Sequence, residues 1–550
     1  IVTNNLCRIL FILISNTWAM VQNYLIFSVL AAFILMILVM VGQKMKIAYP
    51  IFLVLSGLLI SFAPGIPEIE IAPDVVFLIF LPPILFEAAW YTSWKDFSKW
   101  KLPIISLAVG LVIVTSIVMA LTANALIPGM TLALGFLLGS VNSPPDAVAA
   151  TAVLKDMKLP KRIITILEGE SLVNDASSLI VFKFALAAVM TGQFVMSNAV
   201  SDFFIISGMG ITIGLAIGFI FSWIIKWLPG NSNVDTVLTL IIPYILYVVA
   251  EYFHFSGVMA VVSGGLLMSS RSTSFLSHTT RIQSASVWKT LIFMLNAAIF
   301  ILIGLELPVV LKAMNGYDIR EGIFYAVILG GVAIATRVLY IFLFSYLPSV
   351  ITAHKNKKAI KQGWKEPIIM SVSAMRGVVS LAAALSIPYV MADGSPFPHR
   401  NMILFITFVI ILITLVGQGL MLPVLLKFFK MPTDKNSGML EERQEAIIQQ
   451  RIKNRALQQL LTGYGEAMKS NTLINHIKIK LENDIELINN KMKCIRTNEK
   501  HRAAVELSRA AYLDVLKAQR EELHQTMAEH RFDDDVIRNL EMELDLDEVK

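Results

Sequence analysis

Charged residues are scarce in this chain of 550 residues. Only 16% are Asp, Glu, Lys or Arg, whereas 56% are hydrophobic, and a typical soluble domain carries roughly 25% charged residues. Cysteine is also rare, since only Cys7 and Cys494 occur. The sequence therefore indicates neither a disulfide framework nor a cysteine metal site. These shortages exclude an ordinary soluble globular protein and indicate a chain that resides in lipid.

The apolar residues form blocks of about 20 residues as far as residue 430. Such a block is long enough to cross the ~30 Å hydrocarbon core as an α-helix, and helices satisfy their own backbone groups in lipid. We therefore predict an all-α membrane protein. Its thirteen expected transmembrane helices lie at about 21–42, 48–62, 73–91, 102–123, 130–154, 162–191, 203–227, 235–253, 256–269, 288–311, 322–346, 367–391 and 401–429.

Basic residues are distributed unevenly among the predicted loops. Eighteen Lys and Arg residues lie in one set of alternate loops and three in the other. The positive-inside rule places the first set in the cytoplasm. We expect a multi-pass protein of the cell (inner) membrane, with its N-terminus outside and its C-terminus cytoplasmic. Residues 1–430 carry net charge +9, which we interpret as loops facing anionic lipid and not as nucleic-acid binding.

Three regions are predicted along the chain. Residues 1–20 are interpreted as an N-terminal extension read through from a misplaced start, with a short signal-like segment as the alternative. Residues 21–430 form the transmembrane region. Residues 431–550 are polar, with a net charge of −3, and their pattern predicts a cytoplasmic helical tail. A solvated tail is the main interpretation, and a regulatory or dimer-supporting tail is the alternative.

Two predicted membrane helices contain residues that interrupt a helix. The fifth contains Pro144 and Pro145, which remove backbone donors and clash with the preceding turn. The twelfth contains Arg376 beside Gly377 at mid-depth. If helices 1–6 and 8–13 form two inverted six-helix repeats, these two occupy equivalent positions. Paired broken helices of this kind mark the binding site of many transporters, so we expect crossed, unwound helices there.

The sixth predicted helix carries four polar groups within six residues, namely Glu170, Ser171, Asn174 and Asp175. A charge at the centre of a bilayer costs from ~3 to more than 10 kcal/mol, so such a cluster indicates a water-filled path or a paired interior. Residues four apart share a helix face, which places Ser171 with Asp175. Their hard oxygens suit an alkali cation or a proton. Ion or proton transport is therefore the first hypothesis.

Four further groups could assist such a site. Asp146 follows the paired prolines and could be a cation ligand, or it could cap the second half-helix. A buried Arg337 needs a carboxylate partner, for which Glu170 is the natural candidate. Arg376 could offset the C-termini of half-helices or the charge of Asp146. Glu87 could be a ligand, a pathway lining or an interfacial residue.

Three segments resemble one known family. Gly139 to Ala149, Leu167 to Ala176 and Ala374 to Ala384 are similar to the monovalent cation:proton antiporters with an Asn-Asp pair, the sodium/proton exchangers. The resemblance covers roughly residues 21–430. The end of the tail, Leu540 to Leu546, resembles the bacterial branch of that family.

The resemblance implies a fold and a set of roles. It implies thirteen helices arranged as a mobile core and a dimerisation subdomain, and a homodimer that works by an elevator-like movement. The implied roles are alternating cation and proton binding for Asp175 beside Asn174, Na⁺ ligation also by Asp146, Ser171 and, more loosely, Glu87, and a structural ion pair for Glu170 and Arg337. One departure is Pro145, where many relatives carry a hydroxyl residue.

The expected function is a secondary transporter and not an enzyme. We expect electroneutral 1:1 Na⁺/H⁺ exchange for pH and Na⁺ homeostasis, without a cofactor, because Asn174 leaves one carboxylate to exchange one charge for one charge. A proton competes near neutral pH only if burial favours protonated Asp175. A K⁺/H⁺ antiporter is the alternative, and Li⁺ is a further candidate cation.

Two rivals come from other classes. An intramembrane aspartyl protease would use Asp146 and Asp175 as a dyad that shares a proton, but the neighbouring Asn and Arg fit ion binding better. A cation channel would need a repeated ring of ligands, which the sequence does not show.

Overall fold

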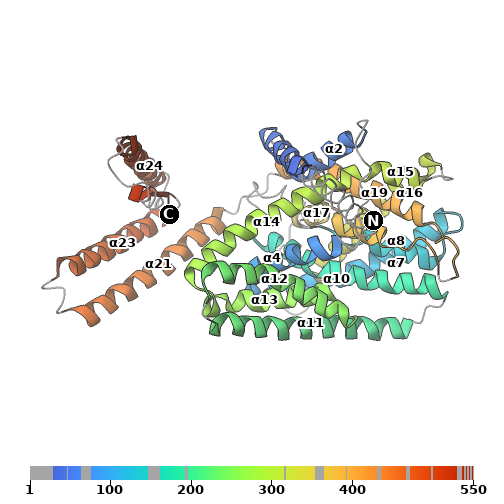
Figure 1. Ribbon diagram of the computed structural model, residues 1–550, viewed down its shortest axis with the longest axis horizontal. Coiled ribbons are helices and arrows are strands. Elements are labelled where there is room, and N and C mark those ends of the chain that lie inside the picture. The colour runs from blue at the N-terminus through green and yellow to red at the C-terminus, as the bar shows by residue number, and fades with distance from the viewer. Residues whose placement is uncertain are drawn as a thin grey trace, which may run out of the picture. The chain divides into compact units, whose positions relative to one another are not determined.

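The computed structural model shows α- and π-helices and no strand among the residues it describes (Figure 1). The described residues are 26, 29–45, 47–62, 76–146, 161–192, 196–228, 230–314, 318–352, 364–391, 393–429, 435–465, 471–496, 500–528 and a few positions between 536 and 548. The predicted N-terminal extension therefore lies outside them. The chain forms two compact units, residues 1–431 and 432–550.

The first unit is a bundle of apolar helices. Within the described ranges, seven helical segments are long and apolar enough to cross a membrane: Lys101–Leu126, Lys161–Thr191, Ser201–Trp227, Ser232–Tyr252, His278–Lys312, Ile319–Phe344 and Arg400–Phe429. Shorter apolar helices cover Val29–Lys44, Tyr49–Ser61, Val76–Tyr91 and Leu132–Asn142. The all-helical membrane architecture is thus confirmed, while the count of thirteen crossings and the inverted repeats stay predictions.

The labelled elements of this unit are α2 (Tyr49–Ser61), η1 (Val76–Phe80), α4 (Leu81–Tyr91), α5 (Trp94–Lys99), α6 (Lys101–Ile105), η2 (Ser106–Leu111), α7 (Val112–Leu126), α8 (Leu132–Asn142), α10 (Lys161–Thr191), α11 (Met196–Trp227), α12 (Ser232–Tyr252), α13 (Gly257–Phe275), α14 (His278–Leu305), α15 (Leu307–Ala313), α16 (Ile319–Thr352), α17 (Lys365–Val372), α18 (Val378–Leu385), α19 (Arg400–Leu412), η3 (Ile413–Gln418) and α20 (Gly419–Phe429).

Local sequence determines where several helices begin. The side chains of Thr131, Asn231, Ser256 and Ser277 cap α8, α12, α13 and α14, each accepting a hydrogen bond from the backbone N–H three residues later. These residue types are preferred N-caps because their oxygens satisfy an otherwise unpaired helical donor. Prolines stand in the first turn of α2, α4 and α15, where their missing N–H has no helical partner to lose.

Buried apolar side chains form two main clusters in this unit. The larger joins α2, α7, α8, α14, α16 and α19. The second joins α4, α11, α12 and α13. Helices α10 and α14 contribute to both clusters, for example through Leu167 and Phe300 in the first and Leu172 and Ile292 in the second. These two helices therefore lie at the boundary between the clusters.

The two predicted helix breaks are present and they meet. Helix α8 ends at Asn142, two residues before the first of the paired prolines. The twelfth predicted helix is divided into α17 and α18, with residues 373–377 non-helical between them. The backbone N–H of Asp146 donates to the carbonyl of Met375 over 2.6 Å, in an isolated antiparallel bridge. The unwound segments therefore pair with each other.

The second unit, residues 432–550, contains α21 (Lys435–Tyr464), α23 (Thr472–Arg496) and α24 (Lys500–Ala528). Helices α21 and α23 pack together as a hairpin. Lys453 donates to Asp484 over 2.6 Å, and Gln450 donates to Asn489 over 2.6 Å. The described part of the tail is therefore helical, in agreement with the pattern of its sequence.

Gly377 is required by the close approach of the two unwound segments. Its φ of −135° and ψ of −150° are extended values that any residue adopts, so the backbone conformation alone does not demand glycine. A Cβ atom at this position would instead overlap the side chain of Asp146, including Oδ2 and Cγ. The need for glycine is therefore steric and comes from a segment more than 200 positions away in the sequence.

We expect Gly377→Ala to destabilise the protein by about 1–3 kcal/mol, the usual cost of inserting a methyl group into a closely packed site. The measurement is the melting temperature of the detergent-purified protein. Gly331→Ala in α16 is the matched control, because a Cβ there meets nothing within 4 Å. Equal melting temperatures for the two variants would contradict a steric role for Gly377.

Candidate cation site

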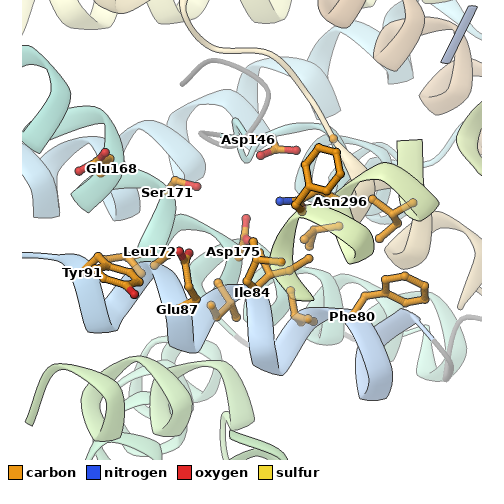
Figure 2. Close-up of a pocket in the computed structure, with 18 of the residues that line it drawn as sticks. Phe80, Ile84, Glu87, Tyr91, Asp146, Glu168, Ser171, Leu172, Asp175 and Asn296 are labelled. Atoms are coloured by element: carbon orange, nitrogen blue, oxygen red, sulfur yellow. The ribbon is translucent and has the colours of Figure 1, made fainter. Parts of the chain in front are cut away.

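A cavity of about 990 Å³ opens between α4, α10 and α14. Its remaining walls come from η1, the segment after α8 and the start of α18 (Figure 2). Most of its lining is apolar and belongs to the two hydrophobic clusters, as with Leu85 and Phe300. Its polar lining includes Glu87, Ser171 and Asp175, and both unwound segments reach it, through Asp146 and Gly377. An enclosed space with a few convergent polar groups is the usual form of a small-ligand site.

Asp175 lies near the middle of α10 and lines this cavity. Its side chain is only 8% exposed. Among the described residues, no basic group forms an ion pair with its carboxylate. The guanidinium of Arg337 is bound to Glu170, and that of Arg376 donates to the carbonyl of Asn142. A buried carboxylate without a fixed partner is unfavourable unless a proton, a cation or water satisfies it.

Three other residues predicted as ligands line the same cavity. Glu87 reaches it from α4, Ser171 from α10 one turn before Asp175, and Asp146 from the segment after α8. Figure 2 shows the side chains of Glu87, Asp146 and Asp175 directed toward one space. Three carboxylates and a hydroxyl supply hard oxygens, which suit alkali cations and protons.

Asn174 is fully buried and is absent from the cavity lining. Its Nδ2 donates to the carbonyl of Pro145 over 2.8 Å. That carbonyl belongs to the segment after α8, which is non-helical at Pro144 and Pro145. The Asn174 side chain therefore ties α10 to the broken fifth helix and leaves Asp175, the next residue, to face the cavity.

Glu170 and Arg337 form a buried ion pair between α10 and α16. They are 1% and 3% exposed. Both carboxylate oxygens of Glu170 accept from the guanidinium, with Nη2 donating to Oε2 over 2.8 Å. Arg337 Nη2 also donates to the carbonyl of Met370 in α17, over 3.2 Å. Neither residue lines the cavity, so this pair joins three helices away from the candidate site.

Arg376 is buried at the crossing of the unwound segments. Its Nε donates to the carbonyl of Asn142, the last residue of α8, over 3.1 Å. Its backbone N–H donates to Thr414 Oγ1 over 3.2 Å. The guanidinium therefore lies at the C-terminal end of a half-helix, where a positive charge is favourable.

Sequence reasoning did not select Asn296 of α14, Glu168 of α10 or Ser380 of α18, and all three line the cavity. Asn296 carried a detectable signal, because it is a lone amide within the apolar run from Leu291 to Ile303. Glu168 stands two residues before Glu170, at the edge of the cluster that was noticed. Ser380 carried no signal, since a serine in a membrane helix usually bonds its own backbone.

The sequence matches the family described as "Sodium/hydrogen exchanger, transmembrane" over residues 29–428. A sodium, potassium, lithium and rubidium/H⁺ antiporter of Bacillus pumilus is 32% identical over 448 residues, which are 80% of this chain and 66% of that protein. An uncharacterized Na⁺/H⁺ exchanger of Mycobacterium tuberculosis is 29% identical over 513 residues, covering 92% of this chain and 93% of that protein.

Among solved structures, the sodium proton antiporter MjNhaP1 of Methanocaldococcus jannaschii superposes with a TM-score of 0.57 at 20% identity. The alignment covers 72% of this chain and 96% of that structure. This likeness supports the fold. The match over most of the chain, together with the broken helices and buried carboxylate, shows that this membrane protein belongs to the sodium/hydrogen exchanger family of cation/proton antiporters.

Proposed function

We propose that this chain exchanges one Na⁺ for one proton by letting Asp175 bind either ion, but never both, as access alternates between the two sides. The observation that carries this proposal is that Asp175 lines the cavity without an ion pair to any basic side chain in the described ranges. Arg337 is bound to Glu170 and Arg376 to the end of α8, so neither competes with an ion for Asp175. Asp146, Ser171 and Glu87 are the proposed additional Na⁺ ligands.

The cavity supports an assignment to one access state. Its lining includes Thr92 at the C-terminal end of α4 and Ser286 and Lys289 in the first half of α14. On the predicted topology these helix ends join cytoplasmic loops. We assign the structure to an inward-facing state, from which an elevator-like displacement of the Asp175-bearing helices would expose the site to the outside.

The stoichiometry follows from the residue beside Asp175. Asn174 is neutral and its amide is bonded to Pro145, so it adds no second titrating group. One carboxylate that exchanges one proton for one monovalent cation moves no net charge. Glu170 and Arg337 serve in this proposal as a structural pair, Arg376 compensates the unwound helix end, and Asn174 positions the broken helix.

The proposed setting is a homodimer in the cell membrane, with the N-terminus outside, the tail in the cytoplasm and anionic lipids at the cytoplasmic loops. Its role there is Na⁺ and pH homeostasis. Potassium is the alternative cation, because the relative from Bacillus pumilus is named as an antiporter of sodium, potassium, lithium and rubidium. Comparing the proton flux driven by each of these four cations discriminates between Na⁺/H⁺ and K⁺/H⁺ exchange.

Asp175→Asn is expected to abolish cation-dependent proton flux in proteoliposomes, because an amide can neither release a proton nor balance a cation. Fluorescence of an internal pH dye measures the flux. Asp235→Asn is the matched control: Asp235 is also buried, accepts a hydrogen bond from Thr280 and does not line the cavity. Flux that survives in Asp175→Asn but depends on cation would remove Asp175 from the mechanism.

We expect the rate of Na⁺-driven proton flux to be independent of membrane potential. A net charge crossing the membrane would add about 2.3 kcal/mol for every 100 mV, or roughly fifty-fold in the equilibrium distribution. The potential is set with valinomycin and fixed K⁺ gradients while Na⁺ drives the exchange. A flux that reverses direction with potential at equal Na⁺ and proton concentrations would contradict 1:1 exchange.

Removing one member of the buried pair should be strongly destabilising. Glu170→Met leaves the Arg337 charge buried, and the usual cost is about 3–5 kcal/mol. The double variant Glu170→Met/Arg337→Met should melt closer to wild type than either single variant. Lys183→Ala is the control, because Lys183 pairs with Glu251 over 3.0 Å at a half-exposed position, where a pair contributes about 1 kcal/mol or less. Single variants at Glu170 that melt like this control would contradict a structural role.

A further inference from the structure

We infer that Asn296 of α14 is a cation ligand that completes the site from the wall opposite Asp175. The inference rests on the proposed antiport function and deepens it, because it adds a residue that determines cation affinity. Helix α14 lies outside the segment that carries Asn174 and Asp175. Asn296 stands about 120 positions beyond Asp175 in the chain.

Asn296 is a buried amide without a protein partner. Its side chain is 5% exposed, yet it lines the cavity. No hydrogen bond joins its side chain to any other residue in the described ranges, although a buried amide carries two donors and two acceptor positions. Leaving such a group unsatisfied costs about as much as a lost hydrogen bond. Something in the cavity must therefore satisfy it.

The direction of the Asn296 side chain indicates which kind of ligand satisfies its amide. In Figure 2 the Asn296 amide extends into the cavity on the side of Asp146 and Asp175. The neighbours of Asn296 in the lining, Phe293, Ile299 and Phe300, are apolar. On this side of the cavity the amide therefore faces the carboxylates of Asp146 and Asp175, which line the same space as Glu87 and Ser171. An amide oxygen is a hard ligand of the kind that alkali cations accept.

Asn296 lies on a different helix from the other proposed ligands. Helix α14 packs mainly along α2 and α12, whereas Asp175 and Ser171 lie on α10. A cation held between Asp175 and Asn296 would therefore bridge two walls of the cavity. The affinity of the site for the cation would then depend in part on the Asn296 amide, which carries no charge and does not titrate. Removing this ligand would therefore weaken cation binding without changing the number of protons exchanged.

Two nearly isosteric substitutions test this assignment. Asn296→Leu removes the oxygen, and Asn296→Asp retains one. Losing a ligand to a charged group should raise the apparent KM for Na⁺ by about tenfold or more in Asn296→Leu, with a much smaller change in maximal rate. Asn296→Asp should keep the KM at or below the wild-type value. Should Asn296→Leu not accumulate, Asn296→Ala replaces it with the same expected rise in KM.

The matched control is Thr290→Val. Thr290 lines the same cavity on the same helix, but its hydroxyl already donates to the carbonyl of Ser286 over 3.1 Å. This variant should keep the wild-type KM. A wild-type KM in Asn296→Leu, or an equal rise in Asn296→Leu and Asn296→Asp, would overturn the assignment, because the first shows no ligand and the second a purely structural role.

A binding measurement separates this inference from the transport proposal. Na⁺ that binds the folded protein raises its melting temperature in detergent, with choline at equal ionic strength as the reference. Asn296→Leu should need about tenfold more Na⁺ for the same rise. Absence of exchange in the wild-type protein would reject the antiport proposal alone. Exchange in wild type with an unchanged Na⁺ requirement in Asn296→Leu would reject only the role of Asn296.

Discussion

Unwinding two helices inside the membrane is the constraint on which this structure depends. Each break leaves backbone N–H and C=O groups without helical partners, and in a membrane helix such groups must be satisfied within the protein or by water in a cavity. The protein supplies partners from within: Asp146 N–H bonds Met375, Asn174 bonds Pro145, and the backbone N–H of Arg376 bonds Thr414. These bonds fix the crossing of the two unwound segments, and the cavity lies beside it.

Three buried arginines share one physical task at helix ends. Arg376 donates to the last residue of α8, Arg337 to Met370 in the final turns of α17, and Arg400 to Leu385 and Ile387 at the end of α18. Each guanidinium meets the partial negative charge of unsatisfied carbonyls. Among these three arginines, Arg337 alone also forms an ion pair with a carboxylate of the described residues, that of Glu170. For Arg376 and Arg400, carbonyl groups at helix ends therefore compensate the buried charge.

Two acidic residues on α10, Glu170 and Asp175, have different surroundings because of helical geometry. Glu170 and Asp175 are five positions apart and therefore point in different directions. Glu170 turns toward α16 and meets Arg337, whereas Asp175 turns toward the cavity and has no basic partner in the part of the chain that the structure describes. A bound pair holds helices together, and an unbound carboxylate is available to ions. The same residue chemistry thus provides both scaffold and candidate site.

The sequence by itself determined the helical class, the membrane setting and the positions of both helix breaks. It did so because apolar length and the paired prolines Pro144 and Pro145 act locally on the backbone, and because a charged Arg376 beside a glycine is unusual within an apolar segment. The polar cluster around Asp175 was visible for the same reason, as charge is costly in lipid. Only the tertiary structure decided which groups share the cavity. Asn296 and Glu87 come from helices far apart in the chain, and the steric need for Gly377 comes from Asp146. Such juxtapositions depend on packing between distant segments, which local spacing does not encode.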